Sequence, residues 1–259
     1  MRVIPRRRRP SPEATMTVVE HLEELRKRLI ISFLAIAVAS VVGFVLYDQI
    51  LELVTGPYRQ TLRTLPLESR PEGALGEGRL VYSSPVDPFL TFMKVGFFSG
   101  FLLALPVLLW QLWRFITPGL TGRERRLAIP FVLSSVVLFG GGTAFAFVII
   151  PRGLSFLLSF GGETLLPLLT VDRYLGFLIL FTLAFGVSFE FPLLMVFLSG
   201  AGVVTTEQMR RLRRFIYFGL VVFAAMITPT GDPFTLLAMW VPLIVLYEAA
   251  IVVARLLNR

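Results

Sequence analysis

The sequence contains no cysteine and only one histidine, His21, in 259 residues. The lack of cysteine excludes disulfide bonds and thiolate metal sites, and a single histidine cannot form a histidine-ligated metal cluster or complete a histidine-based catalytic triad elsewhere in the chain. The chain also has no Gly-x-x-x-x-Gly-Lys phosphate loop and no Gly-x-Ser-x-Gly nucleophile elbow. We therefore expect a protein that is not an enzyme and holds no metal or cofactor. Its function should be binding, or transport driven by an external energy source.

Apolar residues, in contrast, are abundant. Hydrophobic residues make up 55% of the chain, which includes 24 phenylalanines. This composition is too apolar for a water-soluble domain of the same length and indicates an integral membrane protein. The apolar runs are long and lack the alternating polar face of a membrane β-barrel, so the spans should be α-helical.

Six apolar stretches predict the fold class, an all-α integral membrane protein with six transmembrane helices. They cover residues 29–47, 89–116, 127–150, 174–198, 215–227 and 234–254. A single membrane domain from 17 to 259 would follow a disordered basic tail over 1–16. The fifth stretch rises only about 20 Å, less than a hydrocarbon core of roughly 30 Å. Pro242 and Glu248 interrupt the sixth, Pro151 should end the third, and a short helix is expected at 50–54.

The distribution of basic residues predicts the orientation. Six spans place both chain ends on one side, and that side carries 18 of the 25 Arg and Lys residues. These lie in the first 28 residues, in 114–126, in 210–214 and in the C-terminal tail. By the positive-inside rule both termini and the two Arg-rich loops are cytoplasmic, and the long loop over 49–88 lies outside. Basic residues near the surface would also attract anionic lipid.

Two acidic residues fall inside apolar stretches, where a charge costs about 2.5 to 3.5 kcal/mol near the bilayer centre. Glu190 lies in the fourth span, two residues before Pro192. It has either a functional role or a hydrogen bond to another helix. Glu248 lies near the cytoplasmic end of the sixth span, with Arg255 two turns further on the same face. For Glu248 a pair with Arg255 is at least as good an explanation as function.

A dense charged segment, His21-Leu-Glu-Glu-Leu-Arg-Lys-Arg-Leu29, precedes the first span. Thr17 and Glu20 form a capping-box pattern, which predicts a helix that begins near Val18. Within it Glu23 faces Lys27 and Glu24 faces Arg28 at i, i+4 spacing. A self-paired, solvated helix face is one interpretation of this segment, and a ligand site is the other.

The charged segment, the run Trp110-Gln-Leu-Trp-Arg-Phe-Ile-Thr-Pro-Gly-Leu120 with Glu124-Arg-Arg126, and Phe185-Gly-Val-Ser-Phe-Glu-Phe-Pro192 resemble the TatC family, the six-span receptor subunits of the twin-arginine protein translocase. The resemblance covers nearly the whole chain in order. It implies a concave, glove-shaped helical scaffold in the cytoplasmic (inner) membrane of a prokaryote. Such a receptor binds signal peptides with consecutive arginines. With TatA- and TatB-like single-span partners, and further copies of itself, it exports folded proteins at the expense of the proton-motive force. Nucleic acid is not among the implied partners.

The resemblance also implies roles for individual residues. Glu24 and Glu124 correspond to the signal-binding carboxylates, and Arg26, Phe115 and Arg125 belong to the same motifs. Glu190 corresponds to the intramembrane acid of the fourth span. Asp232 corresponds to the acid of the last outer turn, although this turn carries an extra small residue. Glu190, Asp232 and Glu248 are therefore the residues expected to bind a partner or to act as polar groups within the membrane. Thr121-x-x-Glu124 is also a capping box, so Glu124 has a structural role to compete with the receptor role.

Two other functions remain as alternatives. A proton-coupled small-solute transporter would explain Glu190, but it predicts a continuous polar pathway and usually an internal repeat, and neither is visible. An intramembrane enzyme would need a nucleophile with a base, and the spans offer only scattered Ser and Thr. We therefore favour the receptor over both alternatives.

Overall fold

A computed structural model describes residues 18–64, 80–116, 128–159, 169–200, 202–227 and 232–257. These ranges fold into α-helices with one isolated parallel bridge, between Val81 and Thr170. The helices are α1 (Val18–Val45), α2 (Tyr47–Thr64), α3 (Asp87–Ile116), α4 (Ala128–Ser159), α5 (Val171–Gly200), α6 (Thr206–Arg211), α7 (Arg213–Ile227) and α8 (Pro233–Leu257). The all-α prediction is confirmed for the described part of the chain.

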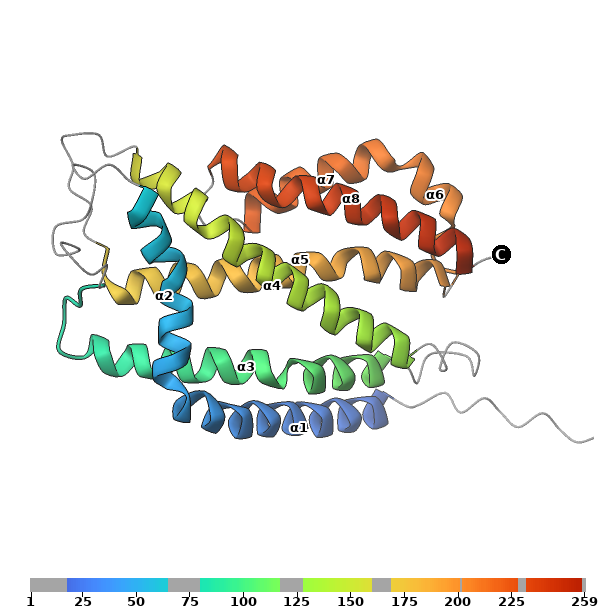
Figure 1. The fold of residues 1–259 in the computed structure, drawn as a ribbon. Coiled ribbons are helices and arrows are strands. Elements are labelled where there is room, and N and C mark those ends of the chain that lie inside the picture. Colours follow the sequence, from blue (N-terminus) through green and yellow to red (C-terminus); the bar gives the residue numbers. More distant parts are fainter. Residues whose placement is uncertain are drawn as a thin grey trace, which may run out of the picture.

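Five of these helices are long and apolar enough to cross a membrane, namely α1, α3, α4, α5 and α8. They match five of the six predicted stretches. α7 corresponds to the fifth stretch and has 15 residues, so it rises about 22 Å. The predicted shortness of this segment is confirmed. The start of α1 and the end of α8 lie at the same end of the bundle, while α2 lies at the opposite end and runs steeply across it (Figure 1).

α1 begins at Val18, as the capping pattern predicts, although Thr17 itself lies outside the described residues. Its closest partner is α3, and small residues bring the two helices together. A Cβ atom added at Gly100 would lie 2.6 Å from Ser40 Cα, and one at Gly43 would lie 2.6 Å from Gly96 O. Because lipid is as apolar as a leucine side chain, packing of this kind holds membrane helices together more than hydrophobicity does.

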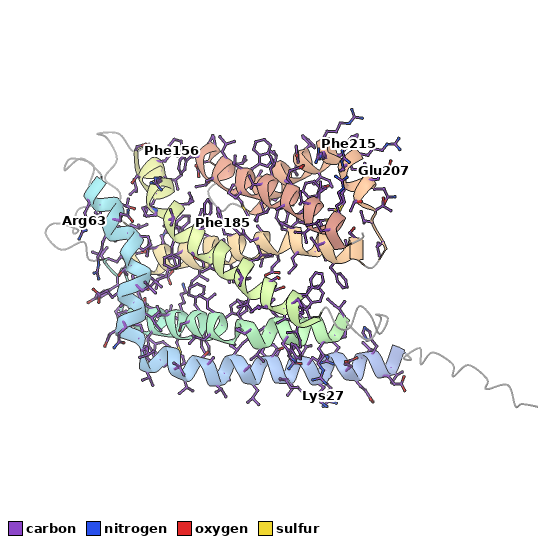
Figure 2. The ribbon with its side chains drawn as sticks, turned by 45° about the vertical axis from the view of Figure 1, so that its right-hand side comes forward. Lys27, Arg63, Phe156, Phe185, Glu207 and Phe215 are labelled. Carbon is purple, nitrogen blue, oxygen red and sulfur yellow. The ribbon has the colours of Figure 1, made fainter. Side chains whose placement is uncertain are left out.

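The centre of the bundle is α5, whose side chains make up much of the core. Leu178, Phe181 and Phe185 are fully buried, and Figure 2 shows Phe185 in the interior between α4 and α5. A Cβ atom at Gly142 would lie 2.6 Å from Phe185 O, so this glycine permits the close approach of α4. Of the three consecutive glycines at 140–142, only Gly142 lies at this contact, since a Cβ atom at Gly140 or Gly141 would meet nothing within 4 Å.

The predicted short helix at 50–54 is in fact the 18-residue α2, which continues through Pro57. Its buried face carries Val54, Tyr58 and Leu62 at helical spacing. The Tyr174 hydroxyl on α5 donates to Val54 O at 2.7 Å. These contacts with the bundle stabilise a helix that Gly56-Pro57 alone would disfavour.

Pro151 does not end the third span, since α4 continues to Ser159. The extension is stabilised by contacts on two sides. Thr61 on α2 donates a hydrogen bond to Pro151 O at 3.3 Å, and Phe156 stacks on Phe234 of α8 with ring centroids 6.3 Å apart. Tertiary packing therefore offsets the hydrogen bond that proline removes from the helix.

The Arg-rich segment 210–214 was predicted to be a loop and is helical instead. It contains the last two residues of α6, the C-cap Leu212 and the first two residues of α7. α6 begins with a capping box in which Thr205 and Gln208 each bind the other's backbone amide, at 3.1 and 2.9 Å. Figure 2 shows Glu207 and Phe215 together at this end of the bundle.

Candidate functional site

The charged first turns of α1 pack against the last turns of α3. The His21 ring stacks on Phe115 with centroids 4.4 Å apart and an interplanar angle of 15°. The segment 21–29 and the described part of the second segment, 110–116, are thus neighbours in space. Phe115 takes part in this packing and is half-buried.

Glu24 lies at the centre of this α1–α3 contact. Its Oε1 accepts hydrogen bonds from Arg28 Nε, at 3.1 Å, and from Arg28 Nη2. Arg28 Nη1 also donates to Gln111 Oε1 of α3 at 3.1 Å. The Glu24–Arg28 pair predicted from i, i+4 spacing is confirmed. The side chain of Glu24 is only 15% exposed and that of Arg28 only 14%, so the pair does not belong to a solvated helix face. Glu24 Oε2 is buried and has no hydrogen-bond partner.

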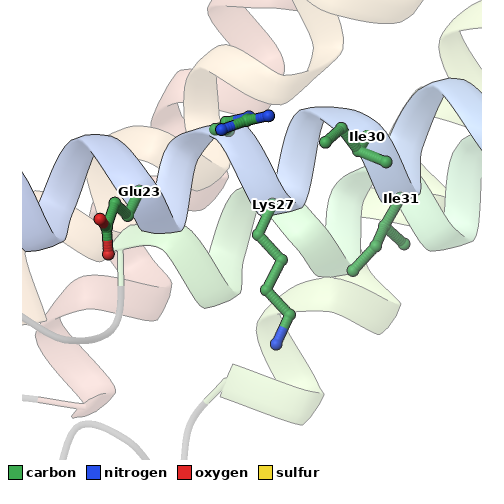
Figure 3. Close-up of a pocket in the computed structure, with 5 residues that line it drawn as sticks. Glu23, Lys27, Ile30 and Ile31 are labelled. Carbon is green, nitrogen blue, oxygen red and sulfur yellow. The ribbon is translucent and has the colours of Figure 1, made fainter.

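Arg26 and Lys27 lie on the outer side of α1 and are exposed. With Glu23, Ile30 and Ile31 they line a shallow groove of about 390 Å³. Figure 3 shows the Lys27 side chain extended away from the helix, with Ile30 and Ile31 one turn further on. Arg26 therefore does not face Glu24, and the structure separates these two predicted site residues.

Glu124 and Arg125 lie outside the described residues, as does the capping residue Thr121. The described helices that flank them are α3, which ends at Ile116, and α4, which begins at Ala128. Eleven residues connect the two helices. The segment with Glu124 therefore starts one residue after Ile116, at the end of α3 that carries Phe115.

Glu190 lies in α5 and belongs to a polar cluster from three helices. Trp113 Nε1 of α3 donates to Ser135 Oγ of α4 at 3.1 Å, and the Ser135 hydroxyl interacts with the Glu190 carboxyl. Glu190 Oε1 is buried without a partner. The interhelical hydrogen bond considered for Glu190 thus accounts for part of its polar surface, and one oxygen is left over. Sequence reasoning did not single out Ser135, because one of two adjacent serines in an apolar run carries no signal that would identify its partner.

Asp232 and Glu248 both have structural partners. Asp232 caps α8, because its Oδ1 accepts the backbone N–H of Thr235 at 2.9 Å and its Oδ2 accepts the Thr235 hydroxyl. Glu248 Oε2 pairs with Arg213 Nη2 at 2.5 Å, and its Oε1 accepts the Tyr217 hydroxyl at 2.5 Å. The expected pair with Arg255 is wrong. α7 packs beside α8 and supplies Arg213, a contact that spacing along α8 could not reveal.

The chemistry available to this arrangement is the binding of cationic groups. The described residues contain no group of three or more His, Asp or Glu side chains that could hold a metal ion. Carboxylates with free lone pairs are instead suited to guanidinium groups, which present a planar fork of donors. Among the described residues, the buried carboxyl oxygens without a hydrogen-bond partner belong to Glu24 and Glu190.

Comparison with known proteins gives a consistent result. The family described as Sec-independent protein translocase protein (TatC) matches residues 20–242. A protein of that name from Frankia casuarinae is 41% identical over 98% of this chain and 70% of its own length. Its counterpart from Aquifex aeolicus is 38% identical over 94% and 97%. A crystal structure of a twin-arginine translocase receptor, TatC, superposes with a TM-score of 0.71 and 36% identity, covering 93% of this chain and all of that one.

Proposed function

Because this chain belongs to the TatC family of Sec-independent protein translocase proteins, we propose that it is the receptor subunit of a twin-arginine translocase. In this role it is not an enzyme. It binds signal peptides with consecutive arginines and, with TatA- and TatB-like single-span partners, exports folded proteins using the proton-motive force. The observation that carries the proposal is Glu24, a mostly buried carboxylate at the α1–α3 contact with one oxygen unpartnered.

The proposed signal site combines this carboxylate with Glu124. Two adjacent arginines need two separately placed acids, and bidentate guanidinium–carboxylate pairing provides both affinity and specificity. Phe115 lies between them in the chain path, as the last aromatic of α3 before the segment with Glu124 and Arg125. Arg26, on the outer face of α1, would contact lipid phosphates or the peptide backbone beside the site, and not its arginines.

The proposed topology has six spans, with α7 as a short fifth one, and both termini in the cytoplasm of a prokaryotic cell. Residues 1–16 form a basic tail and 17–259 form one membrane domain. Two observations support this arrangement. The described ends of the chain lie at one end of the bundle (Figure 1), and the basic residues of α6 and the first turn of α7 lie at that same end. The positive-inside rule makes it the cytoplasmic end.

Glu190 is the proposed contact for a single-span partner. A buried carboxyl oxygen without a partner costs free energy unless a polar group reaches it. A helix that docks against the concave side of the scaffold could supply that group. Asp232 and Glu248 would support this surface by holding α8 and α7 in place. Further copies of the chain would complete the assembly. The small-solute transporter that Glu190 could also have indicated is not favoured by the family match.

The proposal is tested by capture of a twin-arginine precursor on the purified full-length protein in neutral-lipid nanodiscs. A precursor whose arginine pair is replaced by two lysines is the control, since lysine keeps the charge but lacks the planar fork. We expect retention of the arginine form and loss of the lysine form. Equal retention of both, or of neither, would contradict the receptor role.

A further inference from the structure

The carboxylate of Glu24 is closed in this structure. Oε1 accepts two hydrogen bonds from Arg28, and Oε2 is buried without a partner. The two side chains are only 15% and 14% exposed. A guanidinium that arrives from outside can therefore pair with Oε1 only if it displaces Arg28, and the buried Oε2 is not exposed to it.

Arg28 is held in place from both sides of the α1–α3 contact. Its Nε and Nη2 bind Glu24 on α1, and its Nη1 donates to Gln111 Oε1 on α3 at 3.1 Å. This is the contact that an arginine of a bound peptide would make, with a planar guanidinium against a carboxylate. Arg28 and an incoming arginine are thus chemically equivalent ligands for the same acid.

We propose that Arg28 is an internal ligand of Glu24 that a signal peptide must displace, and that it thereby sets the affinity of the receptor site. This inference rests on the proposed function, in which Glu24 binds a signal arginine. Displacement leaves the charge count of the site unchanged, because one guanidinium leaves the acid as another enters. The released Arg28 keeps its link to Gln111 and remains beside the site.

The proposal makes a quantitative statement about affinity and selectivity. The apparent affinity of a ligand equals its affinity for the open site multiplied by the fraction of molecules in which the site is open. A charge-assisted pair of this kind is mostly removed from water. It should favour the closed over the open form of the site by a factor of roughly ten or more. The factor applies before any peptide arrives, so it is the same for peptides with two arginines and with two lysines. Selectivity between the two peptides should therefore not depend on Arg28.

The experiment measures the dissociation constants of two labelled peptides, alike except for an arginine pair or a lysine pair before the apolar stretch. Full-length protein is held in phosphatidylcholine nanodiscs, so that no anionic lipid competes for the arginines. The variants are Arg28→Gln, Glu24→Gln and, as a matched control, Lys27→Gln. Lys27 is the adjacent basic residue and is exposed, so its loss removes the same charge without opening Glu24.

We expect Arg28→Gln to tighten binding of both peptides by roughly tenfold with an unchanged ratio, and Lys27→Gln to have a much smaller effect. Weaker or unchanged binding by Arg28→Gln, together with lost binding by Glu24→Gln, would overturn the inference and leave the receptor role intact. A changed arginine-to-lysine ratio would also overturn it, because Arg28 would then contact the peptide. Full binding by Glu24→Gln would instead contradict the proposed site itself, and the inference with it.

A second variant covers the case in which Arg28→Gln does not fold. Gln111→Met removes the α3 anchor of Arg28 but leaves the Glu24–Arg28 pair and the size of the side chain nearly unchanged. Binding should tighten in the same direction and by a smaller factor. Thermal unfolding followed by tryptophan fluorescence shows whether each variant is folded. No tightening in a folded Gln111→Met protein would count against the proposal.

Discussion

Replacing Glu248 should detach the short helix α7 from α8. α7 is only 15 residues long, and Glu248 binds it at two points, through Arg213 Nη2 and the Tyr217 hydroxyl, both at 2.5 Å. Trp240 Nε1 adds one further bond from α8 to α7, to Tyr217 O at 3.0 Å. Glu248 therefore supplies most of the polar contact between these two helices among the described residues.

The size of the effect follows from these contacts. The side chains of Arg213 and Glu248 are 41% and 34% exposed, so solvent screens their ion pair to about 0.5 to 1 kcal/mol. The hydrogen bond from Tyr217 to a charged acceptor adds about 1.5 kcal/mol. Glu248→Ala should therefore reduce the free energy of unfolding by about 2 kcal/mol. Glu248→Gln keeps an acceptor for Tyr217 and should cost about half as much.

Unfolding in mixed micelles, followed by tryptophan fluorescence as denaturing detergent is added, measures these differences. Glu207→Ala is the matched control, since Glu207 is an exposed acid of α6 at the same end of the bundle. The predicted order of stability is wild type and Glu207→Ala, then Glu248→Gln, then Glu248→Ala. If Glu248→Ala unfolds at the same detergent concentration as Glu207→Ala, Glu248 does not hold α7 to α8.

Three further predictions concern topology, α7 and Glu190. The chain has no cysteine, so a membrane-impermeant thiol reagent added to intact cells should label Glu52→Cys in α2 and not Glu207→Cys in α6; the reverse pattern would contradict the orientation. Inserting four leucines after Val222 lengthens α7 by about 6 Å and should weaken export if the short helix thins the bilayer or docks a partner; unchanged export would mean that its length has no role. Glu190→Ala should reduce crosslinking of a single-span partner to a probe at Phe191, whereas Glu190→Gln should retain it, because an interaction worth about 1 kcal/mol is kept; equal crosslinking in all three proteins would leave Glu190 with only its Ser135 contact.

The membrane helices could be predicted from the sequence because the bilayer fixes the length of an apolar run. Predicted and observed bounds differ by three residues or fewer at both ends of α3, α5 and α8. α2 is longer than the helix predicted at 50–54 because it continues through Gly56-Pro57, with Val54, Tyr58 and Leu62 at helical spacing on its buried face. Hydrophobic periodicity was the better guide there.

Contacts between helices could not be predicted in this way. The ion pair of Glu24 with Arg28 follows from i, i+4 spacing, but the further hydrogen bond of Arg28 to Gln111 on α3 joins residues 83 positions apart. The partner of Glu248 lies on α7 and not one or two turns along α8. Such pairings depend on which helix faces which, and one sequence without a structure does not contain that information.

In the proposed site two carboxylates hold the arginine pair of a signal peptide, and the double variant Glu24→Gln, Glu124→Gln tests this role most directly. Glutamine at 124 keeps the capping-box pattern Thr121-x-x-Gln but removes the charge. Each charge-assisted pair should be worth about 1.5 to 3 kcal/mol at the membrane surface, so each single change should weaken binding of a twin-arginine precursor by roughly tenfold or more. The double variant should lose measurable binding while remaining folded and inserted. Binding as tight as that of the wild-type protein would show that the site is elsewhere, even though the chain belongs to the family.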